Sequence, residues 1–216
     1  MTVVIEFRGS LPKAMTVVIE RGYSGSMSTD RRRSPARARM VRSAATLMRE
    51  RGFHGVGLRE VVAHSGGPRG SLGRYFPGGK TQLMTEAIDD VLVGLFAELD
   101  RTLRESETFE DGIRGIVAPW RHVLLEYDFA LGCPLVASVV DAAANNDALR
   151  VDLSDRLDRW QAKVADIYVK FGDPPAVAAE HATVLLAALE GALVFARARR
   201  DTEPIDTVER YFAARV

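Results

Sequence analysis

The sequence contains one cysteine, Cys133, among its 216 residues. A lone thiol cannot form an internal disulfide or build a cysteine-based metal site, so the chain fits a reducing compartment. Long apolar runs are also scarce: the stretch Ala182–Ala196 is interrupted by Glu190 and falls short of the roughly 20 apolar residues that a membrane-spanning helix needs. The run Val3–Ile5 is much shorter than the core of a secretory signal, which takes about 7–15 residues. We therefore expect a cytoplasmic protein with no membrane partner.

The formal net charge is zero, but the two signs are separated along the chain. Residues 28–81 hold 12 Lys and Arg against 3 Asp and Glu, whereas residues 82–216 hold 14 against 24. A basic front half and an acidic back half predict that the front half binds a polyanion such as nucleic acid and that the back half does not.

The first 33 residues form a leader in which the hexapeptide Met-Thr-Val-Val-Ile-Glu occurs at residues 1–6 and again at 15–20. Two copies of six residues do not make a repeat architecture. We interpret residues 1–33 as a disordered or wrongly assigned leader, with Met27 as an alternative start. The alternative is a short arm that contacts the body or a partner chain, with Arg31–Arg33 placed to reach DNA.

The remaining sequence has helical periodicity, and no strand-like alternation of useful length interrupts it. Expected helices begin at Pro35 and end before Gly52, then cover about 58–64, 68–75, 80–104, 109–127, 135–144, 147–170, 175–200 and 207–214. Two short helices joined by the turn Ser65-Gly66-Gly67 form a helix-turn-helix. The sequence predicts an all-α fold with an N-terminal three-helix DNA-binding domain over residues 34–81 and a helical ligand-binding and dimerisation domain over 82–216.

Residues 52–80 read GFHGVGLREVVAHSGGPRGSLGRYFPGGK. This segment resembles the DNA-binding signature of the TetR family of transcriptional regulators, in its Gly-Phe at the end of the first helix and in Pro-Arg-Gly-Ser-Leu before Tyr-Phe-Pro and a Lys. Its wording, together with Gly132-Cys133-Pro134 in the back half, resembles the LmrA/YxaF-like branch. The resemblance implies a repressor that binds a palindromic operator in double-stranded DNA as a homodimer and is released by a small hydrophobic inducer.

The DNA-binding residues are expected around the third helix. Its N-terminal end, Arg69, Gly70 and Ser71, would enter the major groove, where Arg donates two bonds to guanine and Gly lets the backbone approach closely. The resemblance implies phosphate contacts at Tyr75 and Lys80. Arg59 and Arg74 are further candidates for phosphate contacts, with solvated surface charges as the alternative.

Two positions depart from the family pattern. Gly73 stands where the family usually has Tyr, so an expected contact with the DNA backbone is missing. Val56 and Gly57 replace the hydroxyl cap of the second helix, which weakens a helix by about 1 kcal/mol where nothing compensates. We expect altered or weaker DNA binding, which Arg74 would partly restore.

The back half offers candidates for the ligand and the dimer. Large or polarisable side chains on apolar helices predict the ligand-binding residues Trp120, Phe129, Cys133, Trp160, Tyr168 and Phe195, with plain core residues as the alternative for most of them. Small residues within Ala182–Ala198 allow two helices to approach closely, which favours an interface helix, with a simple buried core helix as the alternative. The arginines at the end of this stretch, among them Arg197 and Arg200, complement the helix dipole.

Other classes of function have less support. An enzyme would use Cys133 as nucleophile with His122 or His181 as base, but nothing in the sequence brings these residues together. His122 and Glu126, four residues apart, are more simply a surface pair than a metal site. We expect no enzyme activity, no cofactor and no metal. The alternative to the repressor is a helical small-molecule-binding protein whose DNA binding is weakened or lost.

Overall fold

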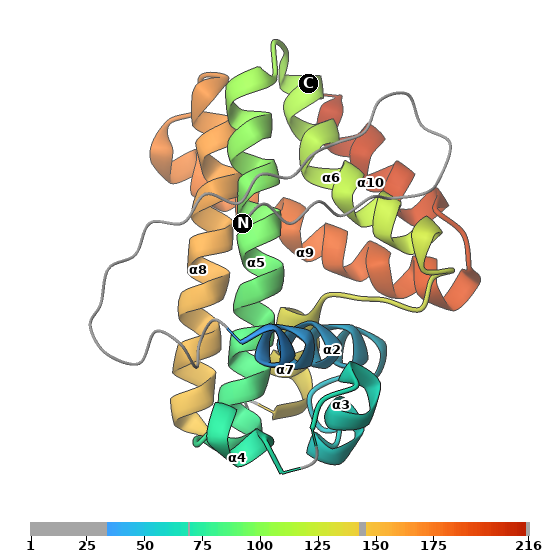
Figure 1. Cartoon of the computed structure of the whole chain (residues 1–216). Coiled ribbons are helices and arrows are strands. Elements are labelled where there is room, and N and C mark those ends of the chain that lie inside the picture. The colour runs from blue at the N-terminus through green and yellow to red at the C-terminus, as the bar shows by residue number, and fades with distance from the viewer. Residues whose placement is uncertain (1–33, 69, 143–145, 215–216) are drawn as a thin grey trace.

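The computed structural model describes residues 34–68, 70–142 and 146–214, and over these ranges every regular element is a helix. In chain order the helices are α2 (Pro35–Arg51), α3 (Leu58–Ser65), α4 (Leu72–Tyr75), α5 (Gly79–Glu105), α6 (Phe109–Glu126), α7 (Pro134–Ala142), α8 (Asp147–Lys170), α9 (Pro175–Arg199) and α10 (Glu203–Ala213) (Figure 1). The predicted all-α fold class is confirmed. The predicted leader, residues 1–33, lies outside the described residues.

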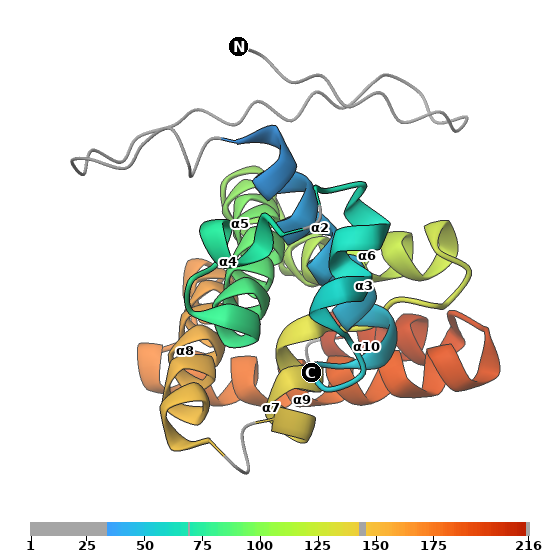
Figure 2. The ribbon, with the colours of Figure 1, turned by 60° about the horizontal axis from the view of Figure 1, so that its bottom comes forward.

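The first three helices form the head of the molecule. α2 begins at Pro35, whose missing N–H costs nothing in the first turn. The predicted inner face of this helix is confirmed, because Met40, Ala44 and Met48 are fully buried. α3 ends at Gly66, where the backbone turns left-handed with a φ of 62° and the following N–H bonds back to Val62. α3 and α4 lie at the same end of the molecule (Figures 1 and 2).

The third helix is shorter than the sequence predicts. We expected a helix from Pro68 to about Tyr75, but α4 begins only at Leu72. Gly70 has a φ of 86°, a left-handed conformation that a right-handed helix cannot include. The Ser71 hydroxyl donates to the Pro68 carbonyl at 2.7 Å and so closes a turn before the helix. Gly70 and Ser71, expected at the helix N-terminus, therefore lie in a turn that leads into the helix.

The C-terminal helix is longer than predicted. We expected Glu203-Pro204 to separate two helices and the last helix to begin at Thr207, but α10 already begins at Glu203. Pro204 falls in the first turn, where a helix has no use for its N–H. Two ion pairs, from Arg121 on α6 to Asp206 and Glu209, fasten α10 to the body.

The body is a bundle of long helices around a core that continues into the head. α5 leaves the head and runs beside α8, while α9 packs against both α8 and α10 (Figure 1). Leu83 and Ala87, near the head, and Leu99, further along α5, are all buried as the predicted apolar face requires. α5 is therefore one continuous connection between the two parts.

Among the described residues one helix, α9, is long and apolar enough to cross a membrane by length and composition alone. Its inner face is packed into the core, with Ala182, Leu185 and Leu189 fully buried. Its outer face exposes Val184 and Val194. A core helix passes the same test, so α9 gives no argument for a membrane, and the expected absence of a spanning segment stays a prediction.

Candidate nucleic-acid interface and regulatory core

The turn before α4 is the part of the head that the sequence assigns to base recognition. Gly70 is exposed, and nothing lies within 4 Å of the position that a Cβ would take there. Its positive φ supplies a second reason for glycine, besides close approach to DNA. Ser71 is buried, with its hydroxyl turned inward to Pro68. Arg69 lies outside the described residues.

Tyr75 ties α4 to the start of α2. Its ring is buried, and its hydroxyl lies 3.0 Å from the Ser34 hydroxyl and accepts a hydrogen bond from Arg74 at 3.2 Å. The bond to Ser34, followed by the bond from Arg74, lowers the pKa of Tyr75. The guanidinium of Arg74 also lies over the Tyr75 ring, 5.0 Å from its centre. Arg74 itself is exposed and close to the hydroxyl that the sequence assigns to a phosphate.

The other two cations differ in their surroundings. Arg59 is exposed on α3, and no partner for its guanidinium occurs within the described ranges. Lys80, in the first turn of α5, donates to the His54 carbonyl at 3.4 Å and lies 5.3 Å from the centre of the Phe53 ring. Partial burial lowers the pKa of Lys80, against the opposing effect of Asp141. Lys80 is therefore partly engaged within the head, whereas Arg59 is available.

Gly73 is exposed on α4, and no atom lies within 4 Å of the position where its Cβ would be. The absence of the family's Tyr is therefore not imposed by crowding. The start of α3 lacks a side-chain cap at Gly57, as the sequence predicts.

A basic hollow on the head was not predicted. It has a volume of about 290 Å³ and is lined by Arg39, Arg42, Ser43, Thr46, His64 and Ser65. Arg39, one of the two arginines of this hollow, donates to the Ser65 carbonyl at 3.2 Å and so also contacts the end of α3. The signal for this hollow was the pair of arginines three residues apart on α2, which share a helix face.

The body brings two of the predicted ligand residues together. Trp120 on α6 and Trp160 on α8 are both buried, with ring centres 5.6 Å apart. Neither indole N–H has a hydrogen-bond partner among the described residues. Buried donors are ordinarily paired, so these two N–H groups are candidates for binding an acceptor.

Cys133 meets an acid that the sequence analysis did not select. Glu190 on α9 lies beside the buried Cys133 thiol, and its Oε1 is shielded from solvent with no partner among the described residues. Burial raises the pKa of Glu190 to about 7, against the hydrogen bond to Cys133. Burial, and then the neighbouring Glu190, raises the pKa of Cys133. A protonated thiol is a poor nucleophile.

The remaining ligand candidates are spread out. Tyr168 is buried next to Phe109 and His181, with ring centres 5.3 and 5.4 Å away. Phe129 is half-buried in the connection between α6 and α7. Phe195 is 56% exposed on the outer face of α9, so it does not share the surroundings of the tryptophans.

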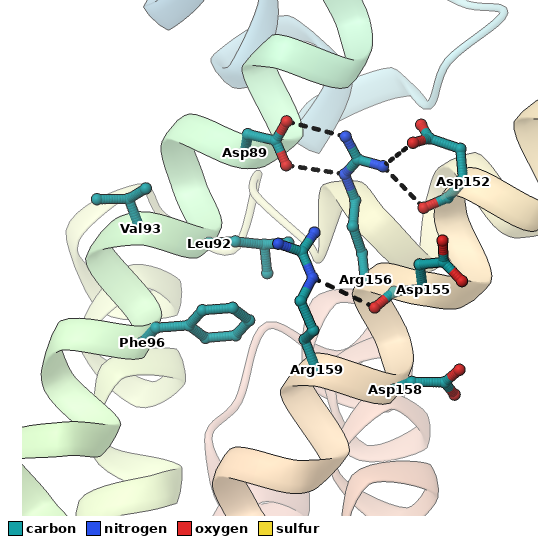
Figure 3. Close-up of a pocket in the computed structure, with 9 residues that line it drawn as sticks. All are labelled: Asp89, Leu92, Val93, Phe96, Asp152, Asp155, Arg156, Asp158 and Arg159. Carbon is teal, nitrogen blue, oxygen red and sulfur yellow. Dashed lines mark hydrogen bonds and ion pairs between the residues drawn. The ribbon is translucent and has the colours of Figure 1, made fainter. Parts of the chain in front are cut away.

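A groove of about 730 Å³ lies between α5 and α8 (Figure 3). Arg156 spans it, with two bonds of 2.8 Å to the Asp89 carboxylate and an ion pair of 2.6 Å to Asp152. Phe96 supplies an apolar side, and none of the six predicted ligand residues lines the groove. We regard it as a surface feature held by ion pairs and distinct from the tryptophan core.

His122 and Glu126 form a pair at 3.0 Å on α6. No group of three or more His, Cys, Asp or Glu side chains within the described part of the chain is arranged to hold a metal ion. The His122 side chain is 61% exposed, which agrees with the surface interpretation given to the pair from the sequence.

A helix-turn-helix head on an all-helical body defines the class of helix-turn-helix transcriptional regulators. The family of bacterial regulatory proteins called tetR matches residues 41–87, and the LmrA/YxaF-like C-terminal domain of transcriptional regulators matches residues 110–211. The chain belongs to the TetR family, and its C-terminal region is of the LmrA/YxaF-like kind.

Individual relatives agree with this assignment. An uncharacterised HTH-type transcriptional regulator of Mycobacterium tuberculosis is 40% identical over 81% of this chain and 90% of its own length. The HTH-type transcriptional regulator LmrA of Bacillus subtilis is 24% identical over 79% of this chain and 90% of its own length. The crystal structure of a regulatory protein TetR from Rhodobacter sphaeroides superimposes with a TM-score of 0.75 at 20% identity, covering 83% of this chain and 98% of that one.

Proposed function

We propose that this regulator is a homodimeric cytoplasmic repressor that binds a palindromic operator and leaves it when a small hydrophobic ligand binds in the body. Residues 34–81 form the DNA-binding domain in this proposal, and residues 82–216 form the ligand-binding and dimerisation domain. No catalytic role is assigned, because the protonated, buried Cys133 lacks the reactivity of a nucleophile.

The observation that carries the DNA-binding part is the group of exposed cations beside a glycine turn on the head. Arg59 and Arg74 are exposed at the end of the molecule that holds α3 and α4. They would contact phosphates, as would the hydroxyl of Tyr75 and the ammonium of Lys80. Arg69 and the backbone at Gly70 would reach base edges, and Ser71 would support them by holding the turn.

The dimer contact is assigned to the outer face of α9. Val177, Val184, Val194 and Phe195 are exposed there, and Ala188 and Gly191 between them leave room for a second helix. Exposed apolar residues in a continuous stripe are typical of an interface. A two-fold dimer would set two recognition helices about 34–36 Å apart, which is one turn of DNA.

The ligand site is assigned to the core around Trp120 and Trp160. Two indole N–H groups without acceptors would gain hydrogen bonds from a ligand that carries oxygen or nitrogen acceptors on an apolar frame. Cys133, Phe129 and Tyr168, which the sequence also selects, complete the proposed set of ligand-binding residues, although they lie in other surroundings than the two tryptophans. Ligand binding would move the heads to a separation that fits the operator poorly, so ligand and DNA would weaken each other's binding reciprocally.

Gel-shift titration of the purified protein against the DNA next to its own gene tests the repressor. The affinity should fall with salt, and Lys80→Ala should reduce the slope of log affinity against log salt by about 1. Arg69→Ala should weaken operator binding by about 1–3 kcal/mol and relax the base preference at the position that Arg69 contacts. Arg150→Ala, an exposed charge change on α8, is the matched control and should leave the slope unchanged. Absence of salt-sensitive affinity for any duplex would contradict the proposal.

A second function, ligand binding without DNA binding, is favoured by one observation. Gly73 lacks the phenol that the resemblance to the TetR family implies at this position of the third helix, although the position is open. Salt-sensitive operator binding by the wild-type protein would exclude this alternative.

A further inference from the structure

The C-terminal end of α2 contacts the connection between α6 and α7, and one arginine of α9 bonds to both. Arg197, in the last turn of α9, is half-buried and points at the connection between α6 and α7. Its Nη2 donates to the Ala130 carbonyl at 2.8 Å, and its Nε lies 3.4 Å from the Phe129 carbonyl. The same Nη2 also donates to the Glu50 carbonyl of α2 at 3.2 Å. One guanidinium therefore joins α9, the α6–α7 connection and the head.

The α6–α7 connection is itself bonded to the head. The Gly132 N–H donates to the Arg49 carbonyl at 2.9 Å, and the Arg49 Nε donates to the Gly132 carbonyl at 3.0 Å. A Cβ on Gly132 would lie 2.7 Å from Nη1 of Arg197, so the glycine is packed directly against the guanidinium. The end of α2 and this connection are thus bonded to each other, and Arg197 of α9 donates hydrogen bonds to both.

The backbone of the connection shows that its shape is imposed by its surroundings. Asp128 and Phe129 are consecutive non-glycine residues with φ values of 49° and 61°. Left-handed conformations of such residues are strained and persist where neighbouring contacts hold them. Arg200 pairs with the Asp128 carboxylate, and Arg197 binds the Phe129 carbonyl, so both contacts come from the end of α9.

The dimer contact and the contact with the head use two different faces of α9. Its outer stripe, with Val184 and Phe195 exposed, is the face assigned above to the dimer contact. Arg197 leaves the same helix towards the head. A helix is a rigid spacer, so a bond from Arg197 to the head also fixes the head relative to the two-fold axis.

We propose that Arg197 is a positioning residue that fixes each head to α9 and thereby sets the separation of the two recognition helices in the dimer. This inference rests on the proposed function, since it assumes a dimer through α9. Arg197 touches neither DNA nor ligand in this role. Its loss leaves the chemistry of each head intact and makes the separation of the heads less defined.

The test measures how strictly the dimer requires one spacing of its half-sites. The probe is a duplex selected by the wild-type protein from randomised DNA, together with versions that carry one or two base pairs inserted at its centre. The wild-type protein should lose at least about tenfold in affinity for the altered spacings. Arg197→Gln should bind the selected duplex more weakly and lose most of this discrimination. Arg197→Lys, which keeps the charge but lacks the planar set of donors, should be intermediate.

Arg199→Gln is the matched control. Arg199 is an exposed cation in the same turn of α9. Among the described residues its guanidinium contacts the ring of Phe195, with 5.2 Å from the guanidinium carbon to the ring centre. The Arg199→Gln variant loses the same charge as Arg197→Gln and should keep the wild-type preference for one half-site spacing. If Arg197→Gln discriminates between spacings as the wild type does, the inference is wrong.

A second measurement needs no DNA and separates the inference from the proposed function. A spin label at Ala63→Cys, an exposed position on α3, reports the distance between the two heads of a dimer. The distribution should be narrow in the wild type and in Arg199→Gln, and broader in Arg197→Gln and Arg197→Lys. An unchanged distribution in both Arg197 variants overturns the inference, whereas a wild-type protein that selects no duplex overturns the proposed function alone.

Discussion

The indole rings of Trp120 and Trp160 lie 5.6 Å apart, one supplied by α6 and the other by α8. Both are buried, and both keep an N–H group that bonds to nothing in the described part of the molecule. The pair adds two buried aromatic rings to the core and leaves two donors without a partner among the described residues. A core arranged for stability alone would pair those donors or replace them with carbon.

Substitutions at Trp160 separate the ring from its N–H group. Trp160→Ala should lower the free energy of unfolding by about 3–5 kcal/mol, because it leaves a large cavity in the core. Trp160→Phe keeps most of the ring and removes a donor without a partner, so the loss should stay below about 1.5 kcal/mol. Urea unfolding followed by circular dichroism measures both. Leu125→Ala, at an exposed position on α6, is the control, and equal losses for Ala and Phe at position 160 would contradict the prediction.

Glu190 should make the stability of the protein depend on pH. The folded chain keeps the Glu190 proton until about pH 7, whereas the unfolded chain releases it near the ordinary pKa of 4.5. The free energy of unfolding should therefore fall as pH rises through this window, by up to about 3 kcal/mol. Glu190→Gln keeps the size of the side chain and cannot ionise, so it should be more stable than the wild type at pH 8 and close to it near pH 4.5.

Urea unfolding of both proteins across pH 4.5–8 measures this difference. Glu180→Gln, an exposed acid on the same helix, should follow the wild-type pH profile. A Glu190→Gln profile that also falls as steeply as the wild type would show that another group titrates.

Gly73→Tyr should strengthen DNA binding. Gly73 is exposed, and no atom lies within 4 Å of the position of an added Cβ. A phenol there would contact the DNA backbone, as the resemblance to the TetR family implies. Replacing a helical glycine also stabilises the helix by about 1 kcal/mol. Gly73→Ala separates these effects, because alanine stabilises the helix but supplies no phenol. The affinity for the operator, measured by fluorescence anisotropy, should rise more for Tyr than for Ala; equal affinities would remove the phenol from the explanation.

Val184→Asp should weaken the dimer. Val184 is exposed in the middle of the outer stripe of α9, where a partner helix would bury the new carboxylate without a counter-charge. Sedimentation equilibrium should show a dimer dissociation constant at least about tenfold higher. Val140→Asp, at an exposed position on α7, is the control and should leave the dimer intact. A normal dimer in Val184→Asp would place the interface elsewhere.

Much of the fold could be predicted because local patterns decide it. The buried face of α2 follows from apolar residues at helical spacing, and the turn at Gly66 follows from a residue that tolerates positive φ. The two boundary errors also have local causes. Proline is common both after the end of a helix and in the first turn of the next helix, so Pro204 did not decide where α10 begins. Pro68 suggested the start of a helix, but the positive φ of Gly70 delays the start of α4 to Leu72.

The site was predicted only in part, because its remaining contacts join residues distant in sequence. The phenol of Tyr75 could be assigned to DNA, but its bond to Ser34 depends on how α4 packs against α2. Arg197 looked like a charge at a helix end, and its three carbonyl partners belong to segments that only the tertiary fold brings to it. The sequence shows Glu190 as an interruption of an apolar run and Cys133 as a candidate residue, but it does not show that the two side chains are in contact.

The burial of Cys133 has a practical consequence for following the protein at work. Because the thiol is enclosed between the start of α7 and Glu190 of α9, an alkylating reagent can reach it only when those helices separate. The chain has no other sulfhydryl group, so the rate of modification counts those openings directly. A compound that increases the separation of α7 and α9 would raise the rate of Cys133 alkylation. Such a compound could therefore be detected before its chemical nature or its effect on transcription is known.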